Sequence, residues 1–215
     1  SFESYQGFPW GCILDFKNSW RVNTGRATVW RTLNNAYKPF QWVCLDKNTT
    51  ISKTFASVNE NDEYVRCQIL PEQNGEIIIS NNDVNIAAVK FGTDFSIYVL
   101  DDGSFIDSGA DWSYDDDWVE IKLKLDYGQS EYEVFYDNYS ITATPLDLDG
   151  NPLTLDKILV KNGNINVLGL DRISVSSQPT SGGGDLAACL NITSPCACNN
   201  EYLEGKVKIE GTVWW

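Results

Sequence analysis

Histidine and methionine are both absent from this chain of 215 residues. Without an imidazole, the chain lacks Ser-His-Asp and Cys-His catalytic sets and histidine metal sites. Its apolar runs are only a few residues long, whereas a membrane helix needs about 20, so we expect no membrane insertion. Because the sequence begins at Ser1 with no initiator methionine, we expect either a removed leader or a start inside a longer precursor.

Cations are also scarce: 16 Lys and Arg residues stand against 30 Asp and Glu residues, and the net charge is −14. Nucleic acids and anionic lipids are bound by clustered cations, so we expect neither as a partner. The charge suits divalent cations or basic partners instead. The hydrophobic content of 42% is sufficient for a packed core.

The six cysteines fall into two groups, one before residue 70 and one after residue 188. With no histidine present they favour disulfides over zinc, although a C-x6-C-x-C zinc site in the tail is an alternative. If all six pair within the chain, an odd number of bridges joins the two groups. The predicted disulfide cysteines are Cys12, Cys44, Cys67, Cys189, Cys196 and Cys198.

Acidity, cysteine use and the missing initiator together predict an extracellular or cell-surface protein. Three Asn-X-Ser/Thr motifs mark Asn48, Asn138 and Asn191 as candidate glycosylation sites. Their number is close to what chance would give, so the count itself decides nothing.

Period-two alternation is clearest at 118–127, where Val119, Ile121, Leu123 and Leu125 share one face of a predicted strand. A turn at Gly128-Gln129 and a returning strand at 131–136 complete a hairpin. In it, glutamates 131 and 133 are expected to meet lysines 122 and 124 across the pair.

Further strands are predicted at 27–30, 40–45, 50–55, 64–70, 76–80, 86–91, 95–100, 140–144, 157–161 and 170–176. Asn-Gly and Asp-Gly turns separate several of them. Many short strands without helical periodicity predict an all-β, antiparallel two-sheet sandwich over 1–177. A linker at 178–185 and a short Cys-rich tail at 186–215, ending in a β-strand, would follow it.

Three segments resemble concanavalin A-like (laminin G-like) jelly-roll domains of bacterial and archaeal secreted proteins. They are Phe2-Glu3-Ser4-Tyr5 with 20–27, the hairpin at 117–137, and Gly169-Leu170-Asp171-Arg172-Ile173-Ser174-Val175. The resemblance covers about residues 1–177 and implies the jelly-roll fold. It implies no particular activity, because that fold carries lectins, hydrolases, adhesins and structural modules.

The glucanases of this fold carry their carboxylates on one strand at E-x-D-x-x-E spacing. The nearest stretches here, 60–63 and 131–133, do not complete that spacing. We therefore expect no catalysis, and a polysaccharide hydrolase remains a lesser alternative.

Aspartates crowd the segment 101–117, which we interpret as two adjacent loops. Oxygen-only loops suit Ca²⁺, and the alternative interpretation is solvated surface charge. No other cofactor is expected. The candidate calcium ligands are Asp101, Asp102, Asp115, Asp116 and Asp117.

Aromatic side chains beside carboxylates are typical of glycan sites, because a ring packs on the sugar and carboxylates accept hydroxyl hydrogen bonds. The candidate glycan-binding residues are Asp111, Trp112, Tyr114 and Asp115. A core position is an equal alternative for Trp112. Trp42 is a weaker candidate, and Trp20 and Trp118 are interpreted as core residues.

The predicted final strand, 205–215, follows a flexible linker and can add to a sheet edge, either of its own sandwich or of a neighbouring subunit. The residues expected to make this contact are Val207, Ile209, Val213, Trp214 and Trp215. The first functional hypothesis is therefore a secreted, self-assembling structural subunit of a filament, sheath or surface layer. The second is a carbohydrate-binding module or adhesin with a glycan as its partner.

Overall fold

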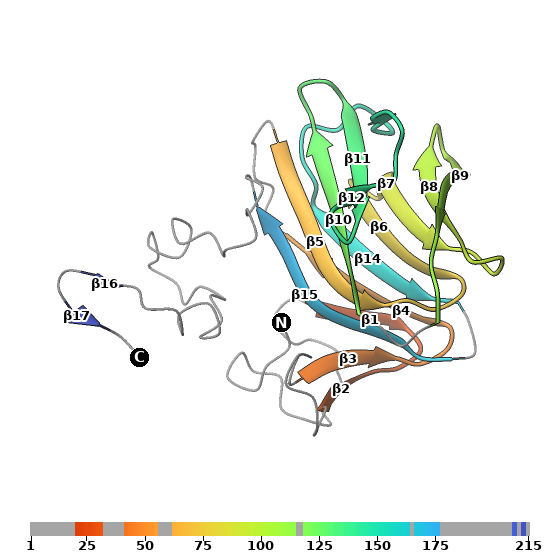
Figure 1. Cartoon of the computed structure of the whole chain (residues 1–215), viewed down its shortest axis with the longest axis vertical. Coiled ribbons are helices and arrows are strands. Elements are labelled where there is room, and N and C mark those ends of the chain that lie inside the picture. Colours follow the sequence, from red (N-terminus) through yellow and green to blue (C-terminus); the bar gives the residue numbers. More distant parts are fainter. Residues whose placement is uncertain are drawn as a thin grey trace. The chain divides into compact units, whose positions relative to one another are not determined.

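The computed structural model describes residues 20–31, 41–55, 62–114, 118–163 and 166–176, together with the backbone at 208–209 and 212–213 (Figure 1). The chain divides into two compact units, Ser1–Ser177 and Gln178–Trp215. No described residue belongs to a helix, and none of the described chain forms a helix able to cross a membrane.

Two antiparallel sheets build the first unit (Figure 1). Sheet I has the order β1 (Trp20–Thr24), β4 (Thr49–Thr54), β14 (Lys157–Asn162), β6 (Gly75–Asn81), β7 (Val84–Phe91), β8 (Ser96–Asp101), β9 (Ser104–Asp111). Sheet II has the order β12 (Tyr139–Ser140), β11 (Glu131–Tyr136), β10 (Val119–Asp126), β5 (Asp62–Leu70), β15 (Leu168–Ser176), β3 (Gln41–Leu45), β2 (Ala27–Arg31), with β13 (Leu146–Asp147) pairing β11. The predicted all-β sandwich is confirmed.

The core lies between the sheets because each central strand turns alternate apolar side chains inward. On β10, Ile121, Leu123 and Leu125 are fully buried and alternate with half-buried charged residues. They join one cluster with sheet I residues such as Ile79 and Val89. The period-two prediction for 118–127 is therefore confirmed residue by residue.

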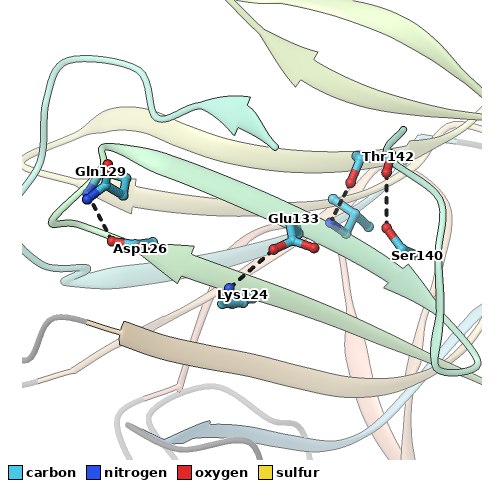
Figure 2. A network of polar contacts seen from close by, with 7 residues as sticks. Lys124, Asp126, Gln129, Glu133, Ser140 and Thr142 are labelled. Carbon is cyan, nitrogen blue, oxygen red and sulfur yellow. Dashed lines mark hydrogen bonds and ion pairs between the residues drawn. The ribbon is translucent and has the colours of Figure 1, made fainter. Parts of the chain in front are cut away.

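The hairpin β10–β11 also bears out one of the predicted charge pairs. Lys124 stands opposite Glu133, and Lys124 Nζ lies 3.2 Å from Glu133 Oε1 (Figure 2). At the turn, the backbone N–H of Gln129 donates to Asp126 Oδ1 at 2.9 Å. The register places Lys122 opposite Phe135, so its ammonium lies 3.9 Å from that ring's centroid instead of pairing with a glutamate.

Strand β9 was not predicted, because its residues were interpreted as a loop. Among the described strands it pairs only with β8, at the edge of sheet I, and its side chains are mostly exposed. Only Ser108 and Ala110 are half-buried, so the sequence shows too little hydrophobic alternation to indicate a strand. A bulge interrupts its pairing with β8 near Gly109, whose φ is +77°.

The predicted single strand at 205–215 is also corrected. In the second unit, β16 (Lys208–Ile209) pairs antiparallel with β17 (Thr212–Val213), so the chain reverses between them. Ile209 and Val213 therefore belong to two short strands. The other expected contact residues, Val207, Trp214 and Trp215, lie outside the described residues, as does the predicted linker.

Cys44 and Cys67 are free, buried thiols, which corrects their assignment to disulfides. They cannot bond to each other, because Cys67 belongs to the core, whereas Cys44 alternates with the core residues Val43 and Leu45 and so lies on the other face of sheet II. Strand β15 also separates their two strands. The cysteines at 12, 189, 196 and 198 lie outside the described residues.

Both thiols are expected to resist alkylation in the folded protein. Burial, and next to it the carboxylate of Asp46, raise the pKa of Cys44 to about 12, and burial raises the pKa of Cys67 as well. Because only the thiolate reacts, iodoacetamide at pH 8 should label both residues in urea and neither in buffer, as read by peptide mass spectrometry. For Cys44 the folded pKa exceeds the ordinary value, so its contribution to stability is lost as pH rises from about 9 to 12. Labelling of either residue in buffer would place that thiol at the surface.

Candidate functional site

Aromatic side chains gather at one end of sheet I, where the turn between β7 and β8 meets the segment after β9. Phe91 ends β7, Phe95 lies in the turn, and Trp112 and Tyr114 follow β9. The backbone N–H of Trp112 donates to the backbone carbonyl of Phe95 at 2.8 Å, so the two segments are joined through their backbones. These contacts place four rings from three segments in one cluster.

Trp112 is the buried base of this cluster. Its side chain is only 3% exposed, and its Nε1–H donates to the Gly92 carbonyl at 3.2 Å. Its ring centroid lies 5.7 Å from that of Phe91, 5.4 Å from that of Phe95 and 4.9 Å from that of Tyr114. A ring covered in this way cannot stack on a sugar, so the candidate role of Trp112 in glycan contact is corrected to a core position.

Phe95 and Tyr114 form the exposed part of the cluster, and we call this pair the aromatic patch. Each residue is 40% exposed. Their ring centroids lie 5.2 Å apart at an interplanar angle of 86°. Phe95 has a φ of +69°, a conformation that is costly for a bulky residue and that recurs at functional sites.

The buried carboxylate of Glu72 holds the Tyr114 side chain through its hydroxyl group. The Tyr114 hydroxyl donates to Glu72 Oε1 at 2.9 Å, and the backbone N–H of Gln73 donates to the same oxygen at 2.8 Å. Glu72 is only 4% exposed. Burial, followed by the bond to Glu72, raises the pKa of Tyr114 to about 12, so its phenol is neutral over the physiological range.

Two exposed aspartates flank the aromatic patch along the chain. Asp94 precedes Phe95; its Oδ2 accepts from the Tyr98 hydroxyl at 2.6 Å, and this bond lowers the pKa of Asp94. Asp111 precedes Trp112 and stands opposite Ser96. Of the predicted glycan residues, the structure therefore brings Asp111 and Tyr114 to one place, whereas Asp115 lies outside the described residues.

The calcium site stays a prediction, because three of its five residues, Asp115, Asp116 and Asp117, lie outside the described residues. Asp101 and Asp102 lie at the turn between β8 and β9, whereas Asp111 ends β9, roughly 20 Å further along the strand. Strand β9, which was interpreted as a loop, separates Asp101 and Asp102 from Asp111. Among the described residues, no three acidic or cysteine side chains form a group able to hold a metal.

Asp101 and Asp102 instead approach the loop after β13. Asp149 Oδ2 accepts from the backbone N–H of Gly103 at 3.0 Å. Burial raises the pKa of Asp149, and the neighbouring charges of Asp102 and Asp101 add to that rise. This group is therefore a set of aspartates that repel one another around one backbone donor.

The carboxylates considered for catalysis are also separated. Glu63 is 2% exposed and points into the core, where the Tyr127 hydroxyl donates to its Oε2 at 2.5 Å. Glu133 alternates with the core residues of β11 and pairs with Lys124. Glu60 lies outside the described residues.

The remaining candidates are three tryptophans and the asparagines of the glycosylation motifs. Trp20 is 2% exposed, as expected for a core residue. Trp118, which was interpreted as a core residue, is instead half-buried and outside the core cluster. It meets the half-buried Trp42 edge to face, at 5.6 Å between ring centroids. The candidate glycosylation residues Asn48 and Asn138 are exposed at tight turns, with φ of 52° and 69°, and Asn191 lies outside the described residues.

No protein-family model matches the sequence, and neither does any curated protein. Several solved structures share its fold. A sialidase aligns at a TM-score of 0.57 and 9% identity over 75% of this chain, and the alignment spans only 17% of that sialidase. The T. cruzi calreticulin globular domain aligns at a TM-score of 0.53 and 12% identity, over 75% of this chain and 85% of that domain.

A third structure, the carbohydrate-binding module CBM66 from Bacillus subtilis, aligns at a TM-score of 0.49 and 11% identity, over 74% of this chain and 96% of that module. At identities of 9% and 12% the sialidase and calreticulin alignments speak to the fold alone. The described sandwich is thus a jelly-roll domain, consistent with the concanavalin A-like fold that the sequence resemblance implies.

Proposed function

We propose that this sandwich is a non-catalytic carbohydrate-binding domain and that the aromatic patch is its binding site. One observation carries the proposal: Phe95 and Tyr114 are exposed over a buried tryptophan, with their rings at 86° to one another. The exposed Asp94 precedes Phe95 in the chain, and the exposed Asp111 stands opposite Ser96. An aromatic ring packs well against the C–H face of a sugar, and carboxylates accept hydrogen bonds from its hydroxyl groups. Pre-organised rings lose little conformational entropy when a ligand binds.

The same residues support binding without chemistry. Glycoside hydrolysis needs two carboxyl groups on either side of one bond, about 5 to 9.5 Å apart. Among the described residues near the aromatic patch, Glu72 is committed to Tyr114 and Gln73, and Asp94 is committed to Tyr98. Neither is placed as an acid facing a partner base across a sugar.

The proposal is tested by affinity electrophoresis of the full chain through gels that contain soluble polysaccharides, with a parallel assay for new reducing ends. The expected result is retardation by at least one polysaccharide with no release of reducing ends. Retardation by none would contradict carbohydrate binding. Release of reducing ends that is lost when Glu72 or Asp111 is changed to its amide would contradict the absence of catalysis.

A second candidate, a structural subunit of an extracellular or cell-surface assembly, is favoured by the edge of sheet I. Strand β9 is eight residues long, pairs with no described strand other than β8, and exposes Phe105 and Ile106. Unprotected edges of this kind accept a strand from a further subunit. Light scattering of the full chain at micromolar concentration tests this candidate, since a strict monomer would contradict it.

A further inference from the structure

We infer that the aromatic patch selects glycans whose sugars carry a protonated amino group over neutral and anionic glycans. This inference rests on the proposed function, because it names the sugar chemistry that the same site recognises.

All charged residues in the segments that build the site are acidic. The segments 71–75, 92–96 and 111–114 contain Glu72, Asp94 and Asp111 and neither lysine nor arginine. Lys90, on the adjacent strand β7, is directed instead at the Phe105 ring, 5.5 Å from its centroid. An anionic sugar would therefore meet like charge at the aromatic patch, whereas an ammonium group would meet opposite charge.

The rings favour a cation as well. The face of an aromatic ring carries negative charge density, and it attracts ammonium groups within about 6 Å of its centroid. Tyr114 donates its hydroxyl proton to the Glu72 carboxylate at 2.9 Å, which pushes electron density into the phenol ring. Its ring is therefore a better cation acceptor than an unpaired tyrosine.

The carboxylates complete the selection. Asp111 is exposed at the end of β9, and the low pKa of Asp94 keeps that exposed side chain ionised in acidic solution. Hydrogen bonds from an ammonium to a carboxylate are stronger than those from a sugar hydroxyl, because both partners are charged. Acetylating the amine removes that charge and leaves only ring packing and neutral hydrogen bonds.

Two probes with the same backbone separate these contributions. Calorimetric titration of the full chain at pH 5.5 compares a tetramer of β-1,4-linked glucosamine with its fully N-acetylated counterpart, and a galacturonic acid tetramer serves as the anionic probe. We expect about tenfold tighter binding of the glucosamine tetramer than of the acetylated one, and no binding of the galacturonic acid tetramer. The preference should shrink as salt is raised.

The chain as a whole is acidic, so matched variants must separate the aromatic patch from general attraction. Asp111→Asn removes one charge beside the patch, and Asp102→Asn removes one exposed charge at the other end of β9. The first should reduce the preference for the glucosamine tetramer several-fold, and the second should leave it unchanged.

The outcomes separate the two proposals. Equal or tighter binding of the acetylated or anionic tetramer overturns this inference and leaves carbohydrate binding standing. Equal effects of the two asparagine variants also overturn it, because the preference would then follow net charge. Failure of all three tetramers and all tested polysaccharides to bind overturns the proposed function and this inference with it.

Discussion

Replacing Trp112 by alanine should lower the free energy of unfolding by about 3–5 kcal/mol, the range found for large aromatic residues removed from protein cores. The ring is 3% exposed and lies against the rings of Phe91, Phe95 and Tyr114. Its loss would leave a cavity beneath the aromatic patch and remove one of the two hydrogen bonds to the Gly92 carbonyl, which would keep only the longer bond from the Phe95 N–H at 3.4 Å. Urea unfolding followed by far-ultraviolet circular dichroism measures the change.

Two further variants make this result interpretable. Trp112→Phe keeps most of the buried ring and loses the hydrogen bond, so its cost should be smaller than that of the alanine variant. Phe105→Ala removes a ring that is 36% exposed, and its cost should be smaller again. A loss of less than about 1 kcal/mol for Trp112→Ala would mean that Trp112 lies at the surface. The assignment of Trp112 as the buried base of the cluster would then be wrong.

Replacing both Phe95 and Tyr114 by alanine should weaken glycan binding by roughly 10- to 100-fold, because burying such rings against a ligand contributes about 1.5–3 kcal/mol. Each residue is 40% exposed, so the double variant is expected to fold. Calorimetric titration with the best-binding oligosaccharide measures the loss, and circular dichroism verifies the fold.

The matched control for this experiment is again Phe105→Ala. Phe105 is an exposed aromatic residue on β9, close to the turn with β8 and far along the strand from Asp111. Its removal should leave glycan affinity unchanged. If the double variant binds as tightly as the unchanged chain, or if Phe105→Ala weakens binding as much, the aromatic patch is not the site.

Most of the sandwich could be predicted from the alternation of apolar and polar residues and from the turn residues of the sequence. Strand β10 alternates apolar and charged residues throughout, and its buried face coincides with the apolar one. The turn Asp102-Gly103 has the positive φ values, 47° and 70°, that its residue types favour. Where burial on one face decides the structure, the periodicity of the sequence records it.

The wrong predictions concern residues whose burial the sequence pattern does not reveal. Strand β9 is half-buried only at Ser108 and Ala110, which is too little to give a clear alternation. Interpreting it as a loop grouped Asp101 and Asp102 with Asp111, which the strand separates. Cys67 lies in the core as a small apolar side chain. The number and spacing of cysteines in a sequence cannot distinguish such a buried thiol from a disulfide cysteine. Trp112 resembles a surface aromatic in sequence because polar residues flank it, but backbone pairing with Phe95 carries it into the core.

The aromatic patch itself was half predicted. Tyr114 and Asp111 were candidates, whereas Phe95 and Glu72 were not, because three separate segments supply the site. Phe95 reaches the surface through a left-handed backbone conformation that its residue type does not signal. Glu72 follows Pro71 in an ordinary turn sequence, and only the fold brings it to the Tyr114 hydroxyl.

The position of the binding site is the central claim, and amide chemical shifts test it most directly. A ¹⁵N-labelled full chain titrated with a bound oligosaccharide should show its largest shifts at 72–74, 92–96 and 111–114, the segments that carry the aromatic patch and its carboxylates. Shifts confined to the outer face of sheet II, around Arg66 and Lys122, would place the site on the other sheet. That result would contradict the account.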